Sequence, residues 1–168
     1  MPLLKAKWLF FSLLIIFITL TSGFLVRIPI VIISCEGNVL YIKPLNKELK
    51  IVVKYIHSVE RTPIIEVYKV RENGLYLEEF LWKSFGAGLP LGPINSRAHI
   101  IEVNGFYCMA NIEEYLGHKL EAWFIPENMC SIQIDNECIV KLSNGGLLIF
   151  RLTYIPLLEA IFNGYLGR

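Results

Sequence analysis

Four ionisable side chains gather in the connection between two strongly apolar stretches of the sequence: His57, Glu60, Arg61 and Glu66. Side chains alternate between the faces of an ideal strand, so His57 and Arg61 would point one way and Glu60 the other. Pro63 cannot donate a hydrogen bond to a neighbouring strand and interrupts pairing here. We therefore expect a turn or bulge that brings these groups together. The resulting polar cluster consists of His57, Ser58, Glu60, Arg61, Thr62 and Glu66.

This polar cluster admits a binding or a structural role. As a binding site, it would use His57 to shuttle a proton or hold a metal, the glutamates as acceptors, and Arg61 to bind a carboxylate. As a structural network, it would pair Arg61 with Glu60 or Glu66 and hold the strand connection in place. A metal site would need a further ligand, such as another histidine from a distant part of the chain. We therefore expect neither a metal nor another cofactor.

A run rich in glycine and proline follows, from Ser84 to Pro93. Its glycines allow the backbone to approach another group closely, so it could form an amide-lined nest for an anion or a rigid lip beside a partner. The alternative is a stiff loop that crosses between two sheets. A P-loop is excluded, because the Gly-Lys-Ser/Thr sequence and the following helix are missing. The candidate loop residues are Gly86, Gly88 and Pro90.

The sequence offers no complete catalytic motif. It has no Gly-x-Ser-x-Gly elbow, no His-Glu-x-x-His and no cysteine beside a plausible base. The formal net charge is +1, and the 16 basic and 15 acidic residues interleave along the chain. Nucleic acid requires a concentrated basic surface, which this pattern does not supply. We therefore expect neither an enzyme nor a nucleic-acid-binding protein.

The chain contains four cysteines, which permit up to two disulfides in an oxidising compartment. Cys130 and Cys138 flank the turn-prone pair Asp135 and Asn136, so two short strands could place them across a hairpin as a candidate disulfide. The alternative is a set of free, buried thiols, because free cysteine is among the most buried residue types.

The N-terminal run from Trp8 to Val26 carries no charge, and its roughly 19 residues are close to the ~20 that a helix needs to cross the hydrocarbon. Lys5 and Lys7 precede the run, whereas only Arg27 follows it closely. The positive-inside bias therefore predicts a cytoplasmic N-terminus and an extracytoplasmic remainder. Small residues from Thr21 to Gly23 would suit a signal peptidase, but the run is longer than the usual apolar core of a signal peptide. We expect a single-pass anchor in the cell membrane.

Short β-branched and aromatic stretches alternate with turn signals after this run. About ten short strands with this spacing predict an all-β fold, either an antiparallel β-sandwich or a partly open barrel. Residues 50–57, 64–70 and 75–83 suggest a three-strand meander. Helix is scarce: we expect one or two turns at Ile112–Leu116 and a short helix at Pro156–Phe162. The candidate strands are residues 28–34, 39–43, 50–57, 64–70, 75–83, 98–103, 106–110, 119–125, 131–134, 138–142 and 147–153.

A chain of 168 residues has room for one domain behind the anchor. We place the anchor or signal peptide at 1–27, the extracytoplasmic β domain at 28–154 and a C-terminal helix or tail at 155–168. The tail is apolar apart from Glu159, so it could dock on the domain or lie at the membrane interface. The lack of lysine and arginine from Ile155 to Leu166 favours docking on the domain.

The run from His57 to Pro63, with Glu66 downstream, and the run from Phe85 to Pro90 together resemble the domain-of-unknown-function family numbered 1850. The resemblance covers roughly Cys35 to Leu152. The residues that fall on the family's recurrent motifs are His57, Ser58, Glu60, Arg61, Thr62, Pro63, Glu66, Gly86, Gly88 and Pro90.

Members of that family are typically small, exported or membrane-anchored proteins. They are similar to proteins encoded beside the permease and the TAXI-type solute-binding subunit of tripartite ATP-independent periplasmic (TRAP) transporters. The resemblance implies an accessory role in solute uptake, docked on the permease or the solute-binding subunit, and it implies no catalytic residues. Two hypotheses from the residues stay open: a small-ligand or metal-binding β domain, with hydrolysis as one option, and a polar cluster that only locks the fold.

Overall fold

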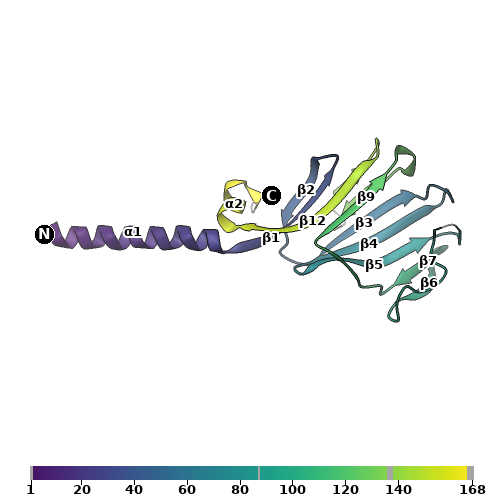
Figure 1. Ribbon diagram of the computed structural model, residues 1–168, viewed down its shortest axis with the longest axis horizontal. Helices are drawn as coiled ribbons and strands as arrows, with labels where there is room; N and C mark the ends of the chain where they lie inside the picture. Colours follow the sequence, from purple (N-terminus) through teal and green to yellow (C-terminus); the bar gives the residue numbers. More distant parts are fainter. Residues whose placement is uncertain (1, 87, 136–137, 166–168) are drawn as a thin grey trace.

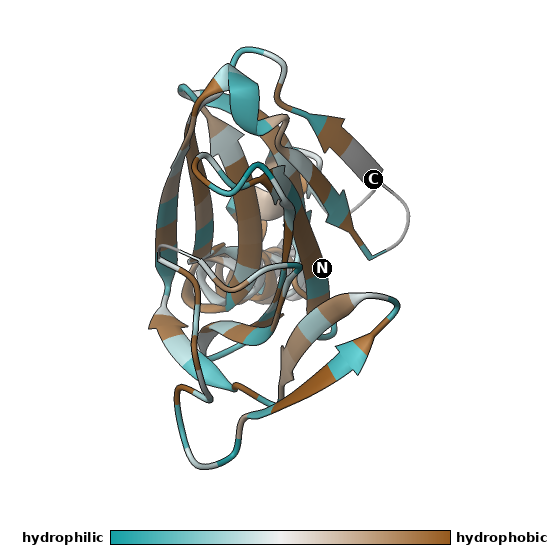
Figure 2. Ribbon diagram, turned by 90° about the vertical axis from the view of Figure 1, so that its right-hand side faces the viewer, coloured by the Kyte–Doolittle hydropathy of each residue, from teal (hydrophilic) through white to brown (hydrophobic). Residues whose placement is uncertain are grey.

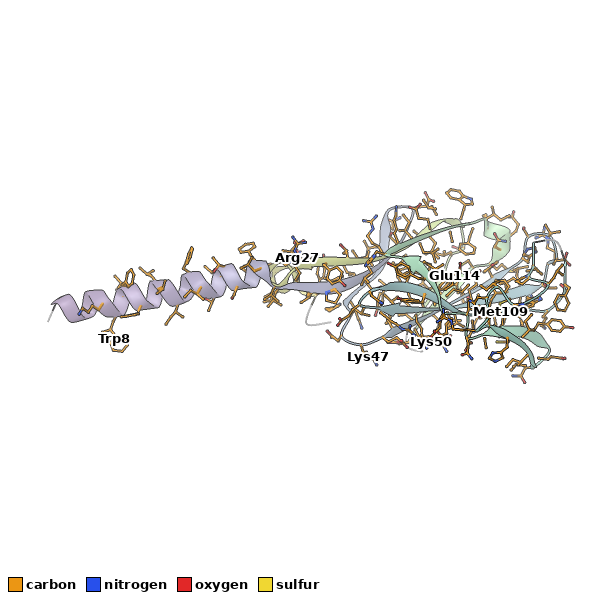
Figure 3. All side chains as sticks on the ribbon, turned by 60° about the horizontal axis from the view of Figure 1, so that its bottom comes forward. Trp8, Arg27, Lys47, Lys50, Met109 and Glu114 are labelled. Atoms are coloured by element: carbon orange, nitrogen blue, oxygen red, sulfur yellow. The ribbon has the colours of Figure 1, made fainter. Side chains whose placement is uncertain are left out.

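The computed structural model describes residues 2–86, 88–135 and 138–165, and in it a long helix stands clear of a β domain (Figure 1). The helix, α1 (Pro2–Leu25), includes an apolar segment, Lys7–Leu25, of which only 6% is buried. By length and composition this segment could be a membrane span or a signal sequence. Trp8 and Arg27 mark its two ends (Figure 3).

The hydroxyl groups within α1 are satisfied by the helix itself. The side chains of Ser12, Thr19, Thr21 and Ser22 each donate to a backbone carbonyl three or four residues earlier, at 2.8–3.0 Å. Such bonds leave no side-chain hydroxyl in need of water, which makes these four residues compatible with a hydrocarbon environment.

The β domain consists of two antiparallel sheets. The smaller sheet has the strand order β2-β1-β12-β9, and α1 leads into β1 after the single residue Val26. Its strands are β1 (Arg27–Cys35), β2 (Asn38–Pro44), β9 (Lys119–Phe124) and β12 (Gly146–Pro156). Because β1 pairs with β12 along its whole length, from Arg27 opposite Pro156 to Cys35 opposite Leu148, both ends of the domain return to the foot of α1.

The larger sheet has the order β11-β10-β3-β4-β5-β7-β6, and β8 pairs separately with β5. A continuous meander, β3-β4-β5, forms its centre, as the sequence predicts. The strands are β3 (Leu49–Ile56), β4 (Pro63–Arg71), β5 (Gly74–Trp82), β6 (His99–Val103), β7 (Phe106–Ala110), β8 (Glu114–Gly117), β10 (Ser131–Ile134) and β11 (Cys138–Lys141). A 3-10 turn, η1 (Pro126–Asn128), precedes β10.

The two sheets pack through an apolar core drawn from their alternating strand positions (Figure 2). Aromatic rings bridge the sheets: Tyr68 lies 5.9 Å from Phe150, and Tyr55 lies 5.2 Å from Phe124, between ring centroids. A second apolar cluster lies at the β5 and β7 side of the larger sheet and includes the fully buried Trp82. The predicted antiparallel β fold is confirmed, and the described strands form open sheets rather than a closed barrel.

The helix expected at Ile112–Leu116 is wrong. Asn111 and Glu113 have positive φ angles of 55° and 46°, which a helix cannot accommodate, and β8 begins at Glu114. The backbone amide of Ile112 donates to the carbonyl of Glu78 on β5, and the Ile112 side chain is fully buried. Pairing with the edge of β5 therefore overrides the local preference for helix.

The short C-terminal helix is confirmed as α2 (Leu157–Phe162), which lies beside the last turn of α1 (Figure 1). The amide of Leu157 donates to the carbonyl of Val26 at 2.8 Å. The Leu158 side chain lies directly over Gly23, where an added Cβ would be 2.6 Å from Leu158 Cγ. The C-terminal helix α2 therefore contacts the end of α1 at the junction between helix and domain.

Candidate functional site

The two motif segments lie together at the end of the domain opposite α1 (Figure 1). The first is the turn between β3 and β4, residues 57–62, and the second is the loop after β5, residues 83–86 and 88–98. Strands β3 and β5 both run away from the helix, so their C-terminal ends deliver both segments to this end. We call it the distal end.

The first turn is organised by His57. The backbone amide of Arg61 donates to the His57 carbonyl at 3.0 Å, and the His57 amide donates to the Thr62 carbonyl at 2.9 Å. The imidazole Nδ1 accepts a hydrogen bond from the amide of Glu60 at 3.1 Å, which assigns the proton of the neutral ring to Nε2. Arg61 has a φ of 52°, in the left-handed region, and this reversal directs the chain into β4.

Glu60 joins this turn to the glycine-rich loop. Its carboxylate lies against the Cα of Gly86, so closely that an added Cβ would be 2.0 Å from Oε1 and 2.7 Å from Oε2. Gly86 does not have a positive φ, so the close approach of Glu60, rather than an unusual backbone conformation, requires glycine there. The two motifs therefore form one surface.

The glycine-rich loop is anchored by aromatic and apolar packing. The Phe85 ring lies 4.4 Å from that of Tyr107 and 5.8 Å from that of Trp82, and the Leu89 side chain is buried against the second apolar cluster. The Leu89 amide also donates to the Gly86 carbonyl. The expected loop is therefore present, but it is held on the domain rather than wholly exposed.

Buried polar side chains in and beside the two motif segments have hydrogen-bonding groups that are not satisfied within the described part of the chain. Thr62 Oγ1, Trp82 Nε1 and Ser84 Oγ are buried and have no hydrogen-bond partner among the described residues. Thr62 directly precedes β4, and Ser84 lies two residues after the end of β5. Two of these three atoms therefore belong to the motif segments themselves.

Glu66 points away from this junction, into a pocket between the sheets. Its Oε1 accepts a hydrogen bond from the Tyr55 hydroxyl at 3.0 Å, and its Oε2 accepts one from the Tyr68 hydroxyl at 2.6 Å. The pocket has a volume of about 280 Å³. It is lined by Tyr55, His57, Ser58, Glu66, Tyr68, Ala122, Trp123, Phe124 and Asn128.

Burial controls the protonation of this pocket. It raises the pKa of the Glu66 carboxyl above its usual range, and the hydrogen bonds from Tyr68 and Tyr55 offset this only in part. Burial and the neighbouring carboxylate also raise the pKa of both tyrosine hydroxyls, so they remain donors at physiological pH. Asn128 closes one wall, where its side-chain amide donates to the Ile56 carbonyl at 2.7 Å.

The structure thus divides the predicted polar cluster. His57 and Ser58 line the pocket with Glu66, whereas Glu60 turns to Gly86. Arg61 is exposed, and in the described part of the chain its guanidinium forms no ion pair with Glu60 or Glu66. Ion pairs on β4 involve Lys69 and Arg71 instead, with Glu48, Glu78 and Glu113 as partners.

Tyr55 and Tyr68 are not among the residues predicted for the polar cluster. The alternation of β4 could have pointed to these tyrosines. Ile64, Glu66 and Tyr68 share one face of the strand, and Ile64 and Tyr68 are buried, so Glu66 lies on the core face. A carboxylate on the core face of a strand needs hydrogen-bond donors nearby. Tyrosines on the same face or on the adjacent strand are natural candidates for that role.

The predicted bridge between Cys130 and Cys138 does not fit the observed register. Cys138 lies opposite Ile134, at the far end of the hairpin from Cys130, whose carbonyl accepts the amide of Leu142. Four residues of strand separate the two levels by roughly 14 Å, whereas a disulfide needs Cα atoms within about 7 Å. Cys130 is a buried free thiol, and burial raises its pKa to about 12, while the Cys138 side chain lies outside the described residues.

The described residues include no group of three metal-binding side chains. His99 lies on β6, and His118 makes a hydrogen bond with the Tyr115 hydroxyl at 3.3 Å. Neither lines the pocket that contains His57. The metal-binding form of the second hypothesis therefore has no support from these residues.

A family model described as Domain of unknown function (DUF1850) matches residues 51–140, which is more than half of the chain and contains both motif segments. The chain belongs to this family. The matched region runs from β3 to β11 and so covers the larger sheet, the distal end and the Glu66 pocket of this DUF1850 domain. Comparison with curated proteins and with solved structures gives no match.

Proposed function

We propose that this DUF1850 protein is a membrane-tethered, extracytoplasmic accessory component of a TRAP-type (TAXI) uptake system, and that its distal end docks on the solute-binding subunit. The observation that carries the proposal is the contact of Glu60 with Gly86, which joins the two motif segments into one surface. The transporter assignment rests on the resemblance of those motifs. The permease is the alternative docking partner.

The tether is supported by the junction of α1 with the domain. A signal peptidase acting near Gly23 would remove the surface on which Leu158 packs, and would cut close to the Val26 carbonyl that accepts the Leu157 amide. A signal peptide has no need of such contacts with the mature domain. With Lys5 and Lys7 before the span, the domain lies outside the cytoplasm.

The distal end has the character of a contact surface. Val59 is 66% exposed beside Glu60, and Leu91 is 84% exposed on the glycine-rich loop. A patch of exposed apolar residues with a polar rim is typical of protein-interaction sites, and Val59 and Leu91 are the residues from which we propose such a patch is built. Since this surface points away from α1, it suits a soluble extracytoplasmic partner better than one embedded in the bilayer.

Site-specific photocrosslinking in native membranes tests this proposal. A photoreactive phenylalanine analogue at Val59 or Leu91 is expected to capture the solute-binding subunit. The same analogue at Val39, which is 59% exposed on β2 of the other sheet, is the matched control and should capture neither subunit. Adducts with the permease would redirect the docking assignment. No adduct with either subunit, together with unimpaired solute uptake after gene deletion, would refute the accessory role.

The Glu66 pocket favours a second candidate function, the binding of a small polar solute. Because Nδ1 of His57 accepts from the Glu60 amide, the ring can donate from Nε2, and Ser58 adds a hydroxyl to the same lining. His57 and Ser58 form no hydrogen bond with each other in the described structure, so we assign no hydrolytic step.

Three test ligands probe this second function: acetate as a carboxylate, glycine as a zwitterion and glycerol as a polyol. A thermal shift with one of them that Glu66→Gln abolishes would support this function, and no shift with any of them would count against it.

A further inference from the structure

We propose that α2 is a second membrane contact, with Ile161 and Phe162 inserted at the boundary between the headgroups and acyl chains of the outer leaflet. This inference rests on the proposed tether. The partner is a lipid surface, which the α1 span already places beside α2. Three features of α2 support the contact: its depth, the direction of its apolar face and its composition.

The depth follows from the contacts with α1. Nineteen residues from Lys7 to Leu25 rise about 28 Å, close to the ~30 Å thickness of the hydrocarbon. Gly23 is two residues before the end of that span, so Leu158, which packs on it, lies at the edge of the hydrocarbon. The hydrogen bond from the Leu157 amide to the Val26 carbonyl fixes the first turn of α2 at the same level.

The direction of the apolar face follows from helical spacing. Residues three and four positions apart lie on one side of a helix, so Ile161 and Phe162 share the face of Leu158. Because Leu158 contacts α1, this face is turned toward the span and the surrounding lipid. Ala160, on another side, is fully buried. The exposed side of α2 is therefore its membrane side.

The composition of this face agrees with a lipid environment. Phe162 is 83% exposed and Ile161 is 51% exposed, although both are large apolar residues. Such residues at the foot of a membrane span bury their surface when lipid surrounds them. Glu159 is the only charged residue of α2, and it is exposed. The helix needs no basic residues to bind lipid, because α1 already holds it there.

A second membrane contact would restrict the tilt of the β domain relative to the membrane more than a single span can. The span alone allows the domain to tilt about the α1–β1 junction, whereas α2 would brace it from the side of β12. Since β1 and β12 are paired along their length, both lead into the bilayer surface as one unit. The distal end would then stand at a defined height above the membrane.

Depth-dependent quenching in proteoliposomes tests this inference on the full chain. Single cysteines at Phe162, Ile16 and Val59 would carry an environment-sensitive dye, and the vesicles would contain phospholipids with a nitroxide on the acyl chain. The unsubstituted protein supplies the background from native cysteines. Ile16 lies in the span and Val59 at the distal end, and both are more than half exposed, so labels should not disturb folding.

We expect quenching at Phe162 to fall within about twofold of that at Ile16, as for a residue at the acyl-chain boundary, and Val59 to be unquenched. A label at Ile161 should follow Phe162. If Ile16 is quenched while Phe162 and Ile161 behave like Val59, the α2 contact is refuted and the tether stands. If Ile16 is not quenched either, the tether itself fails, and this inference fails with it.

Discussion

The carboxylate of Glu60 lies against the Cα of Gly86, where an added Cβ would be 2.0 Å from Oε1. The two residues are separated by strands β4 and β5, yet they join the turn after β3 to the loop after β5. This contact holds two segments of the region that matches the DUF1850 model in one surface, at the end of the domain farthest from α1.

Substitution of Gly86 by alanine should force the Glu60 carboxylate out of its place. We expect the free energy of unfolding to fall by about 1 kcal/mol. This is the low end of the usual cost of overpacking, because the displaced group is a side chain that can move. Chemical denaturation measures the loss. Gly92→Ala is the matched control, since nothing lies within 4 Å of its Cβ position and its φ is not positive.

The same contact predicts non-additivity. Truncation of the acid in Glu60→Ala removes the obstacle, so Glu60→Ala combined with Gly86→Ala should be more stable than the sum of the single changes predicts. The expected coupling is about 0.5–1 kcal/mol. Strict additivity of the two substitutions would show that they do not interact and would separate the motif segments again.

Arg61 should be dispensable for stability. It adopts a φ of 52° and is exposed, so Arg61→Gly relieves a left-handed conformation and is expected to stabilise the domain by about 0.5–1 kcal/mol. Arg61→Ala keeps the strain and should leave stability nearly unchanged. Thermal and chemical unfolding measure both. A loss above about 1 kcal/mol in Arg61→Ala would restore the structural network that the sequence suggests.

Strand positions are predictable because their signal is local. Short β-branched and aromatic stretches with turn signals between them predict the β3-β4-β5 meander. The strand β8 escapes prediction because its cause is distant: Ile112 and the residues after it are drawn to the edge of β5. The order of strands in the sheets depends equally on contacts between distant segments.

In the candidate site, too, the local sequence predicts which residues gather but not which distant residues they contact. The types and spacing of residues 57–66 predict a polar cluster, but the turn geometry decides where each side chain points. The sequence suggests that Arg61 pairs with Glu60 or Glu66, yet Arg61 is exposed and Glu66 is turned into the pocket between the sheets. The sequence predicts Gly86 as a loop residue that another group can approach closely, but it does not identify Glu60 as that group, because glycine has no side chain that would mark a partner.

The raised pKa of Glu66 predicts that stability falls with rising pH. Below about pH 4.5, its ordinary pKa, the carboxyl is protonated in both states, so the domain keeps its full stability. Above that pH, the unfolded chain loses this proton first, which favours unfolding until the native group also ionises. Each tenfold difference in proton affinity between the native and the unfolded carboxyl costs the native state about 1.4 kcal/mol.

Glu66→Gln should remove this pH-dependent loss of stability. The free energies of unfolding of the unsubstituted protein and of Glu66→Gln, measured from pH 4 to 8, should therefore diverge as pH rises. Parallel curves would contradict the burial argument.

Loss of a tyrosine hydroxyl should raise the pKa of Glu66 further. The hydrogen bond from Tyr68, at 2.6 Å, lowers that pKa against the effect of burial, so Tyr68→Phe removes part of the offset. We expect a stability loss of about 1–3 kcal/mol at neutral pH. Carbon-13 NMR of labelled glutamate carboxyls follows the titration directly. Tyr76→Phe is a suitable control, because Tyr76 lies on β5 outside this pocket.

Gly23 should control the attachment of α2 to the span. Valine at this position would place methyl groups where Leu158 now lies, since even a Cβ would be 2.6 Å from Leu158 Cγ. We expect Gly23→Val to displace α2, so that a dye at Phe162 loses most of its quenching by lipid nitroxides. Ser12→Val adds similar bulk to an exposed position of α1 and should leave quenching unchanged. The β domain should keep its thermal stability in both variants, because its core lies beyond the junction. Undiminished quenching in Gly23→Val would mean that α2 keeps its depth in the membrane without the contact to α1. The contact between Gly23 and Leu158 would then not be needed to hold α2 there.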